Sequence, residues 1–490
     1  MNNRKIVEFG DFQTPFVLAK KVCQKLKDIH VNPDVVLEPT CGLGAFIYAA
    51  ANSFPKAKRI IGVEINPFYV NKLRNDLFLS NYKKIEIIQG DFFKINWETI
   101  IEPQQSLLVI GNLPWVTNAK QGLIGGSNLP VKKNFQNKNG FDAITGKSNF
   151  DISEWMLMQI SNWLNKKGGY LAMLCKTSVA RKILNYHYLQ KISTTCSAIF
   201  NIDAKKHFGV SVDAGLLYCK FDKKFQNHDY GVYRNIGTDS KNKMGHRNGI
   251  LIRDIEKFEK YKKLFGSSEI TWRSGVKHDC SKIMELTKTK NGHLENGINE
   301  LVDIESTFLY PLLKSSDIAN NRIKKTNRYV LITQSSVGES TNKIKNIAPK
   351  TWEYLINHAQ YLDNRKSRIY KNNPRFSIFG IGPYTFAPWK IAISGLYKNI
   401  KFRLVNLIEG KTVIFDDTIY FLYFDIRNDA EKAYKLLTSE PAIEFFSSII
   451  FMDEKRPIKS SILNYLSLKS LEKNQYIYLD STTKYNTDIF

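Results

Sequence analysis

A short apolar run that ends in a polar pentapeptide constrains the fold of this chain more than any other stretch. Residues 107–110 (Leu-Leu-Val-Ile) are typical of a buried strand, and Gly111-Asn112-Leu113-Pro114-Trp115 ends it abruptly. The amide of Asn112 is therefore expected at the carboxyl tip of the strand, where open α/β sheets bind their ligands. Pro114 favours an extended Leu113, whose carbonyl oxygen then lies beside that amide.

This pentapeptide suits the recognition of an aromatic amine. The side-chain oxygen of Asn112 and the backbone oxygen of Leu113 can accept the two hydrogens of an amino group. The indole of Trp115 can stack on the ring that carries the amine. The pentapeptide therefore predicts a binding site for such a ring at the strand tip.

A glycine turn follows an earlier strand, residues 34–37, and leads into a helix expected at about 45–53. The turn is part of Glu38-Pro39-Thr40-Cys41-Gly42-Leu43-Gly44-Ala45-Phe46. A strand, a glycine turn and a helix place backbone N–H groups around a ligand. A dinucleotide site would need a third glycine where Ile47 stands, which disfavours an oxidoreductase. Glu38 would repel a pyrophosphate and suits a ligand with a positive amino group.

Two more strand tips carry acidic residues. Glu64 ends the apolar run 60–63, about 20 residues after the glycines, a spacing that suits hydrogen bonds to both hydroxyls of a ribose. A solvated glutamate is the alternative, and the preceding glycine turn makes it the weaker one. After the run 85–88, Asp91 could accept from an adenine amino group while Phe92 packs nearby.

An amphipathic helix is expected near the start of the chain. Thr14 would cap it and Pro15 would take its first position, with apolar residues at helical spacing from Val17 to Leu26. These two residues alone indicate only a good helix start.

The motifs, in this order, resemble those of the amino-methylating DNA methyltransferases. They are similar to the TaqI-like γ group, in which cofactor motifs come first, the catalytic motif next and target recognition last. The resemblance is strong over about residues 9–220. It implies methyl transfer from S-adenosyl-L-methionine to adenine N6 in double-stranded DNA after base flipping, within a restriction–modification system.

The resemblance also implies a role for each matched residue. The implied cofactor-binding residues are Thr14, Pro15, Glu38, Pro39, Thr40, Cys41, Gly42, Gly44, Phe46, Glu64, Ile65, Asp91 and Phe92. The implied catalytic residues are Asn112, Leu113, Pro114 and Trp115, with Trp115 and Phe208 stacking on the target base. Leu113 departs from the proline usual at the second place of the catalytic motif, but the family uses only its carbonyl. Asn112 rather than serine favours adenine N6 over cytosine N4.

The segment from Asn118 to Phe150 is rich in glycine and lysine and includes Lys132 and Lys133. A loop of this length is functional or disordered. Because it begins at the catalytic motif, we expect a flap that contacts DNA rather than a passive insertion. A helix capped by Asp151, a strand at 170–175, a helix at 177–190 and strands at 197–202 and 214–221 are expected to complete the catalytic domain.

The second half of the chain contains a basic and aromatic region. Residues 321–380 hold twelve basic and three acidic side chains, with tyrosines and phenylalanines between them. This mixture suits DNA contact, although a solvated basic face over ordinary core aromatics is the alternative. The expected DNA-binding residues here are Arg365, Lys366, Arg368, Lys371 and Arg375. We therefore expect a catalytic domain over 1–225, a connector over 226–300 and an α+β target-recognition domain over 301–490.

Composition agrees with this interpretation. A chain of 490 residues favours two domains, and a net charge of +25 is most often explained by nucleic acid. No apolar run approaches about 18 residues, no signal peptide is evident, and six scattered cysteines form no metal motif. We expect a cytoplasmic monomer with no metal and no membrane association, and a cognate endonuclease would act separately. The alternatives are an RNA or protein-glutamine methyltransferase, an inactive DNA-binding protein, and a chain with a fused nuclease.

Overall fold

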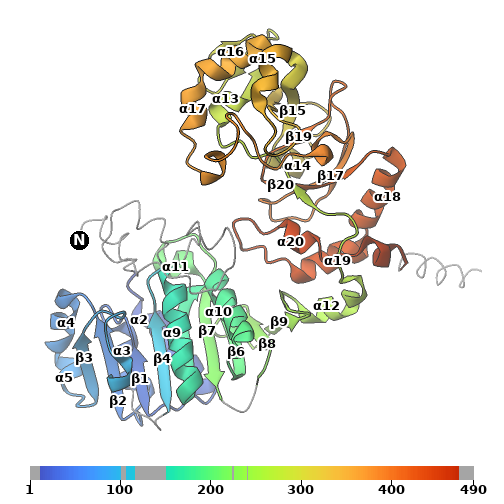
Figure 1. Ribbon diagram of the computed structural model, residues 1–490. Coiled ribbons are helices and arrows are strands. Elements are labelled where there is room, and N and C mark those ends of the chain that lie inside the picture. The colour runs from blue at the N-terminus through green and yellow to red at the C-terminus, as the bar shows by residue number, and fades with distance from the viewer. Residues whose placement is uncertain (1–11, 101–105, 116–150, 223–225, 240, 474–490) are drawn as a thin grey trace, which may run out of the picture. The chain divides into compact units, whose positions relative to one another are not determined.

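The computed structural model describes residues 12–100, 106–115, 151–222, 226–239 and 241–473. The chain divides into two compact units, Met1–Ile252 and Arg253–Phe490 (Figure 1). The expected flap, with Lys132 and Lys133, lies outside the described residues. Among the described helices, none is long and apolar enough to cross a lipid bilayer.

The first unit is built on one ten-stranded sheet. Its strands are β1 (Val35–Glu38), β2 (Arg59–Glu64), β3 (Ile85–Gln89), β4 (Leu107–Asn112), β5 (Gly169–Lys176), β6 (Thr194–Ile202), β7 (Ala214–Phe221), β8 (Asp229–Tyr233), β9 (Lys241–Arg247) and β10 (Ile250–Ile252). Their order is β10-β9-β8-β6-β7-β5-β4-β1-β2-β3. The strands β3, β2, β1, β4 and β5 are parallel, and β7 is antiparallel to both β5 and β6.

Helices cover both faces of this sheet, as expected for parallel strands that are buried on each side. The helices are α2 (Phe16–Asp28), α3 (Ala45–Ser53), α4 (Pro67–Arg74), α5 (Leu77–Ser80), α6 (Trp97–Ile100), α9 (Ile152–Lys167), α10 (Thr177–Leu189) and α11 (Ala204–Phe208). In Figure 1, α9 and α10 lie over the middle of the sheet, in front of β4 to β7. Helices α2 and α3 pack against each other and share one core with the strands.

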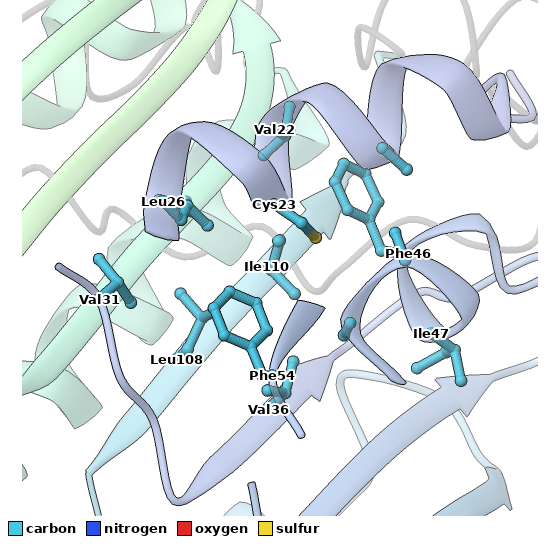
Figure 2. Packing of buried hydrophobic residues seen from close by; sticks show 14 of the residues in the cluster. Val22, Cys23, Leu26, Val31, Val36, Phe46, Ile47, Phe54, Leu108 and Ile110 are labelled. Carbon is cyan, nitrogen blue, oxygen red and sulfur yellow. The ribbon is translucent and has the colours of Figure 1, made fainter. Parts of the chain in front are cut away.

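Alternation along the strands explains this core. Leu108 and Ile110 of β4 lie in the cluster with α2 and α3, and the intervening Val109 is equally buried. Figure 2 shows Leu26 of α2, Ile110 of β4 and Phe46 of α3 within this packing. A continuous apolar run such as that of β4 therefore contributes side chains to the hydrophobic cores on both faces of the sheet.

The strands and helices expected in the first 221 residues are present, with one difference at the start of α2. Helix α2 begins at Phe16, so Pro15 occupies the cap position and Thr14 provides no side-chain cap. The backbone oxygen of Pro15 accepts from the N–H of Leu18, which shifts the expected helix start by one residue. The sheet also continues beyond Phe221 through β8, β9 and β10. The sequences of β8 and β9 do not alternate clearly enough to predict strands, and β10 is only three residues long.

The stretch 226–300 is divided between the two units. Residues up to Ile252 extend the first sheet, and the second unit begins with α12 (Ile255–Tyr261), followed by the short helix η1 (Lys262–Leu264). Helix α12 therefore belongs to the second unit.

The second unit contains two sheets. Its strands are β11 (Arg273–Ser274), β12 (Glu285–Lys288), β13 (Leu294–Asn296), β14 (Leu301–Val302), β15 (Leu309–Leu313), β16 (Arg328–Leu331), β17 (Trp389–Ser394), β18 (Arg403–Val405), β19 (Ile414–Phe415) and β20 (Ile419–Phe424). One sheet has the order β11-β20-β17-β18 and the other β14-β13-β12-β16-β15-β19. Each sheet contributes to a separate hydrophobic core.

Short helices surround these two sheets. They are α13 (Ser281–Met284), α14 (Ser315–Ala319), α15 (Ile344–Ile347), α16 (Pro349–Asn357), α17 (Ala359–Asp363), α18 (Arg427–Thr438), α19 (Glu440–Ile449) and α20 (Ser460–Leu463), with 3-10 turns η2 (Ser306–Phe308), η3 (Thr341–Lys343), η4 (Arg368–Tyr370) and η5 (Pro383–Phe386). Helix α17 packs into the core of the six-stranded sheet, whereas α18 packs on the four-stranded sheet. The second unit is therefore α+β, as expected.

Candidate active site

Three polar side chains end neighbouring parallel strands at one edge of the first sheet. Glu38 ends β1, Glu64 ends β2 and Asn112 ends β4, and β1 lies between the other two strands. The order of connection reverses between β1 and β4, which is where doubly wound sheets bind their ligands. The structure thus brings together the expected cofactor-binding and catalytic tips.

The glycine turn between β1 and α3 has the backbone shape that only glycine adopts easily. Gly42 has φ +52° and Gly44 has φ +77°. A Cβ atom at position 42 would lie 2.7 Å from Oε1 of Gln13, and one at position 44 would lie 2.7 Å from a methyl carbon of Leu73. The backbone N–H of Gly42 donates to Oε2 of Glu64 at 2.8 Å, so the turn is held against the next strand.

Glu38 is a buried carboxyl group with no opposite charge beside it. Its side chain is 3% exposed, and none of the described residues forms a hydrogen bond with its Oε2. Burial and then the nearby Glu64 raise the pKa of Glu38 well above its ordinary value, while the backbone N–H of Ile47 opposes the rise. Burial and the two glutamates also raise the pKa of Cys41. The site therefore disfavours another negative charge and would favour a positive group.

Glu64 is held in place by the backbone. Its Oε1 accepts from the N–H of Asn66 at 2.8 Å, and its Oε2 accepts from Gly42. Each carboxylate oxygen has a second lone pair, so this arrangement leaves capacity for further donors. The next residue, Ile65, is 43% exposed, which places an apolar surface beside the carboxylate.

The tip of β3 lies next to that of β2, because the N–H of Gly90 donates to the backbone oxygen of Glu64 at 3.0 Å. Oδ1 of Asp91 accepts from the N–H of Phe93 in its own loop. Phe92 is buried in an aromatic group with Trp97 and Trp163. Phe92 therefore supports this loop through its packing, and its expected place beside an adenine ring stays a prediction.

The amide of Asn112 is fixed in one orientation. Its Nδ2 donates to the backbone oxygen of Phe12 at 3.3 Å, and its Oδ1 is buried without a hydrogen-bond partner among the described residues. The reverse orientation would place two oxygens against each other. A buried acceptor without a donor costs free energy, about 1–3 kcal/mol, unless a ligand supplies one. This oxygen is thus prepared to accept from an incoming N–H group.

Trp115 and Phe208 lie close together beside Asn112. Their ring centroids are 5.1 Å apart at 66°, in an edge-to-face contact, and Trp115 also packs on Ala204 and Ala214. A base stacked between two rings needs about 7 Å between them, the upper end of aromatic pair distances. The expected sandwich is therefore not preformed, and the stacking roles remain predictions that require the rings to separate. The ring nitrogen of Trp115 is buried without a partner.

The remaining expected cofactor residues divide into two groups. Thr14, Pro15 and Thr40 are partly exposed near the site, and the hydroxyl of Thr40 lies 3.5 Å from the backbone oxygen of Asn112. Pro39 and Phe46 are buried, and Phe46 is fully enclosed in the core with α2. Phe46 is therefore placed to support α3 rather than to contact a ligand.

Two residues beside the strand tips, Phe12 and Gln13, were not expected to be part of the site. Besides Phe12, which contacts Asn112, Gln13 accepts from the N–H of Leu43 through its Oε1 at 2.9 Å. Their only signal in the sequence is a position just before Thr14 and Pro15. Neither residue type carries a chemistry that would have identified it.

In the second unit, two of the predicted DNA-binding residues, Arg365 and Arg375, form contacts within the fold. Arg365 donates to the backbone oxygens of Leu362, His278 and Ser377 and lies over the ring of Tyr370. Arg375 forms a two-point ion pair with Asp363. These two arginines therefore brace the local fold, in contrast to the expected phosphate contacts.

Three other predicted DNA-binding residues remain accessible. Lys366, Arg368 and Lys371 are exposed around η4, and the ion pairs among the described residues do not include them. Because they have no acidic partner, their charges are available to a polyanion.

Comparison with known proteins identifies close relatives. No family model matches the chain. It is 54% identical over 469 residues to the type II methyltransferase M.NspV of Nostoc sp., covering 95% of this chain and 98% of that protein. It is 38% identical over 108 residues to the type II methyltransferase M.CvrRI of Paramecium bursaria Chlorella virus XZ-6E, covering 22% of this chain and 25% of that protein.

One solved structure is similar over nearly the whole chain. This is the type IIL restriction–modification enzyme MmeI in complex with DNA, with a TM-score of 0.53 and 12% identity, covering 96% of this chain and 69% of that one. At this identity the likeness concerns the fold alone. It confirms the expected class, a Rossmann-like methyltransferase sheet accompanied by further sheets.

Proposed function

The chain belongs to the type II methyltransferases of restriction–modification systems, which use S-adenosyl-L-methionine, and we propose that it methylates adenine N6 in double-stranded DNA. The order of its motifs, with the cofactor motifs before the catalytic motif and the basic unit last, supports the assignment to the TaqI-like γ group. We assign target recognition to the second unit.

The observation that carries this proposal is the prepared acceptor at the tip of β4. Within the part of the chain that the structure describes, Asn112 Oδ1 is buried and unpartnered while its Nδ2 is held by Phe12. An exocyclic amino group would satisfy this oxygen, and the Leu113 carbonyl would take its second hydrogen. Asparagine at this place favours adenine over cytosine, as the family resemblance implies.

The residues around the glycine turn fit the cofactor. The buried carboxyl group of Glu38 would receive its ammonium group, and Glu64 its ribose hydroxyls, beside the exposed Ile65. Asp91, at the next strand tip, would accept from the amino group of the adenine. Bound S-adenosyl-L-methionine supplies an electrophilic methyl group at this edge. The glycines allow the backbone to approach such a ligand closely.

Catalysis would consist mainly of positioning the amine. An adenine within a duplex is out of reach, so it must leave the stack at a cost of about a few kcal/mol. The lone pair of its amino nitrogen is delocalised into the ring. Acceptance of both hydrogens by Asn112 and Leu113 favours a pyramidal nitrogen and exposes the lone pair for attack. The attacking nitrogen needs no prior deprotonation, and no covalent bond to the chain forms.

Substitution of Asn112 tests the proposed role directly. We expect Asn112→Ala to lower kcat for DNA methylation by about 100-fold or more, because it removes one acceptor that acts in the transition state. The affinity for S-adenosyl-L-methionine should change by less than about threefold in calorimetric titration. Asn52→Ala is a matched control, since the Asn52 amide bonds the backbone oxygen of Tyr48 on the exposed side of α3. Near-normal turnover of Asn112→Ala would refute the role.

The identity of the product tests the choice of base. Methylated DNA digested to nucleosides should contain N6-methyladenine. N4-methylcytosine would overturn the assignment to adenine, and methylation of RNA or protein in preference to duplex DNA would overturn the substrate class. Incubation with Mg²⁺ should leave the DNA uncut.

A further inference from the structure

The dipeptide Phe12-Gln13 joins the cofactor turn to the catalytic motif. The backbone oxygen of Phe12 accepts from the Asn112 amide at 3.3 Å, and its ring lies 6.3 Å from that of Trp115. The side chain of Gln13 bonds the N–H of Leu43 at 2.9 Å. Two adjacent residues thus contact both halves of the site, which are separated by about 70 residues of sequence.

Phe12 determines whether the oxygen or the nitrogen of the Asn112 amide is directed toward the substrate. Its carbonyl can only accept, so it selects the orientation in which Nδ2 points toward it. The oxygen of Asn112 is then left for the amine. If the carbonyl moved away, the amide could rotate and present hydrogens to a group that also carries hydrogens.

Gln13 in turn determines where this carbonyl lies. The side chain of Gln13 covers Gly42, since a Cβ atom there would lie 2.7 Å from Oε1 and 2.9 Å from Nε2. It also accepts from Leu43, so its position follows that of the turn. On the other side, the chain enters α2, whose buried residues hold it in the core. Only Thr14 and Pro15 separate Gln13 from the first residue of α2.

We propose that Gln13 is a positioning residue that couples the folded glycine turn to the orientation of the Asn112 amide through the backbone of Phe12. This inference rests on the proposed role of Asn112. Gln13 contributes to the rate without contacting the target amine. When the glycine turn is in place, Gln13 holds the carbonyl of Phe12 toward Nδ2, and the catalytic oxygen faces the substrate.

Gln13→Met tests this coupling, because methionine fills a similar volume over Gly42 but cannot accept from Leu43. We expect kcat to fall by about 10-fold, the equivalent of one hydrogen bond. The KM for DNA and the Kd for S-adenosyl-L-methionine should each change by less than about threefold. Gln24→Met on α2 is the matched control, since its amide only bonds Asp28 on the surface.

The possible results for Gln13→Met distinguish the proposed coupling from its alternatives. Unchanged kcat in Gln13→Met would overturn the coupling, even if Asn112→Ala had lost its activity and the proposed function held. A weaker cofactor Kd with normal kcat would also overturn it and make Gln13 a cofactor ligand only. A fall in kcat that parallels a large loss of thermal stability would indicate a structural role instead. Loss of kcat alone, with the product still N6-methyladenine, supports the coupling.

Discussion

Glu38 is a residue whose carboxyl group departs strongly from the chemistry of a free side chain. It lies between Asn112 and Glu64 along the strand tips, is enclosed by the core below, and has an unpartnered oxygen. The pKa of Glu38 is raised first by burial and then by Glu64. In the free protein the carboxyl group is therefore protonated over a wider pH range than usual, and a bound cation would favour its ionised form.

This raised pKa makes Glu38 a source of pH-dependent stability. Between the ordinary pKa and the raised folded pKa, the folded chain binds more protons than the unfolded chain, so its stability falls as pH rises. In Glu38→Gln, the free energy of unfolding without cofactor should fall less between about pH 5 and about pH 9 than in the native protein, by urea titration. The variant should also bind S-adenosyl-L-methionine at least about 10-fold more weakly. Identical pH profiles and affinities would contradict this account.

At the scale of elements, the sequence predicts what depends on local chemistry. The helix α3 begins and ends where expected, because the glycine turn and the apolar run determine both limits. The caps of α9 and the extent of β7 are likewise determined by residues within or beside them. The strand tips of the site were predictable for the same reason, since each apolar run ends in a polar residue.

Other features depend on contacts between distant residues and could not be predicted. β9 has a polar sequence and joins the sheet by pairing with β8 rather than by burying an apolar face. Arg365 and Lys366 are adjacent in the same basic segment. Only Arg365 lies over the ring of Tyr370 and donates to three backbone oxygens. The contact of Gln13 with Leu43 spans 30 positions and has no local signature.

Asp151 links helix α9 to strand β5, which is adjacent to β4. Its Oδ1 accepts from the N–H of Ser153 and caps α9, while its Oδ2 pairs with Lys176 at the end of β5 at 2.6 Å. We expect Asp151→Ala to lower the free energy of unfolding by about 2–3 kcal/mol, because a largely buried cation loses its partner and the helix loses its cap.

Two matched variants separate the two effects of Asp151. Asp151→Asn retains an oxygen for the cap and should cost less than the alanine variant. The double variant Asp151→Ala with Lys176→Met should recover part of the loss, since no buried charge remains. Urea denaturation of the native protein, of these three variants and of the single variant Lys176→Met measures these differences. Simple additivity of the two single substitutions would show that the ion pair contributes nothing.

At the scale of the whole molecule, chemistry and target choice place different demands on the chain. Under the proposed function, the carboxyl edge of the first sheet would orient any accessible adenine, because its acceptors would contact only the amino group. Selection of a site in DNA therefore requires further contacts. A net charge of +25 provides a general attraction to DNA, but this attraction has no preferred position. Local contacts to phosphate are needed to set the register.

Lys366, Arg368 and Lys371 are the exposed cations for which we expect such contacts. Replacing all three with alanine should reduce the slope of log K against log salt by up to about 3, since each phosphate contact contributes about 0.9. Arg427, Lys432 and Lys435 of α18 form the charge-matched control, which removes the same net charge from a helix packed on the other sheet of the unit. Fluorescence anisotropy with duplex DNA at several salt concentrations measures both slopes, and kcat at saturating DNA should remain unchanged. An equal reduction in the control would mean that only total charge matters, and that η4 is not a phosphate-binding site.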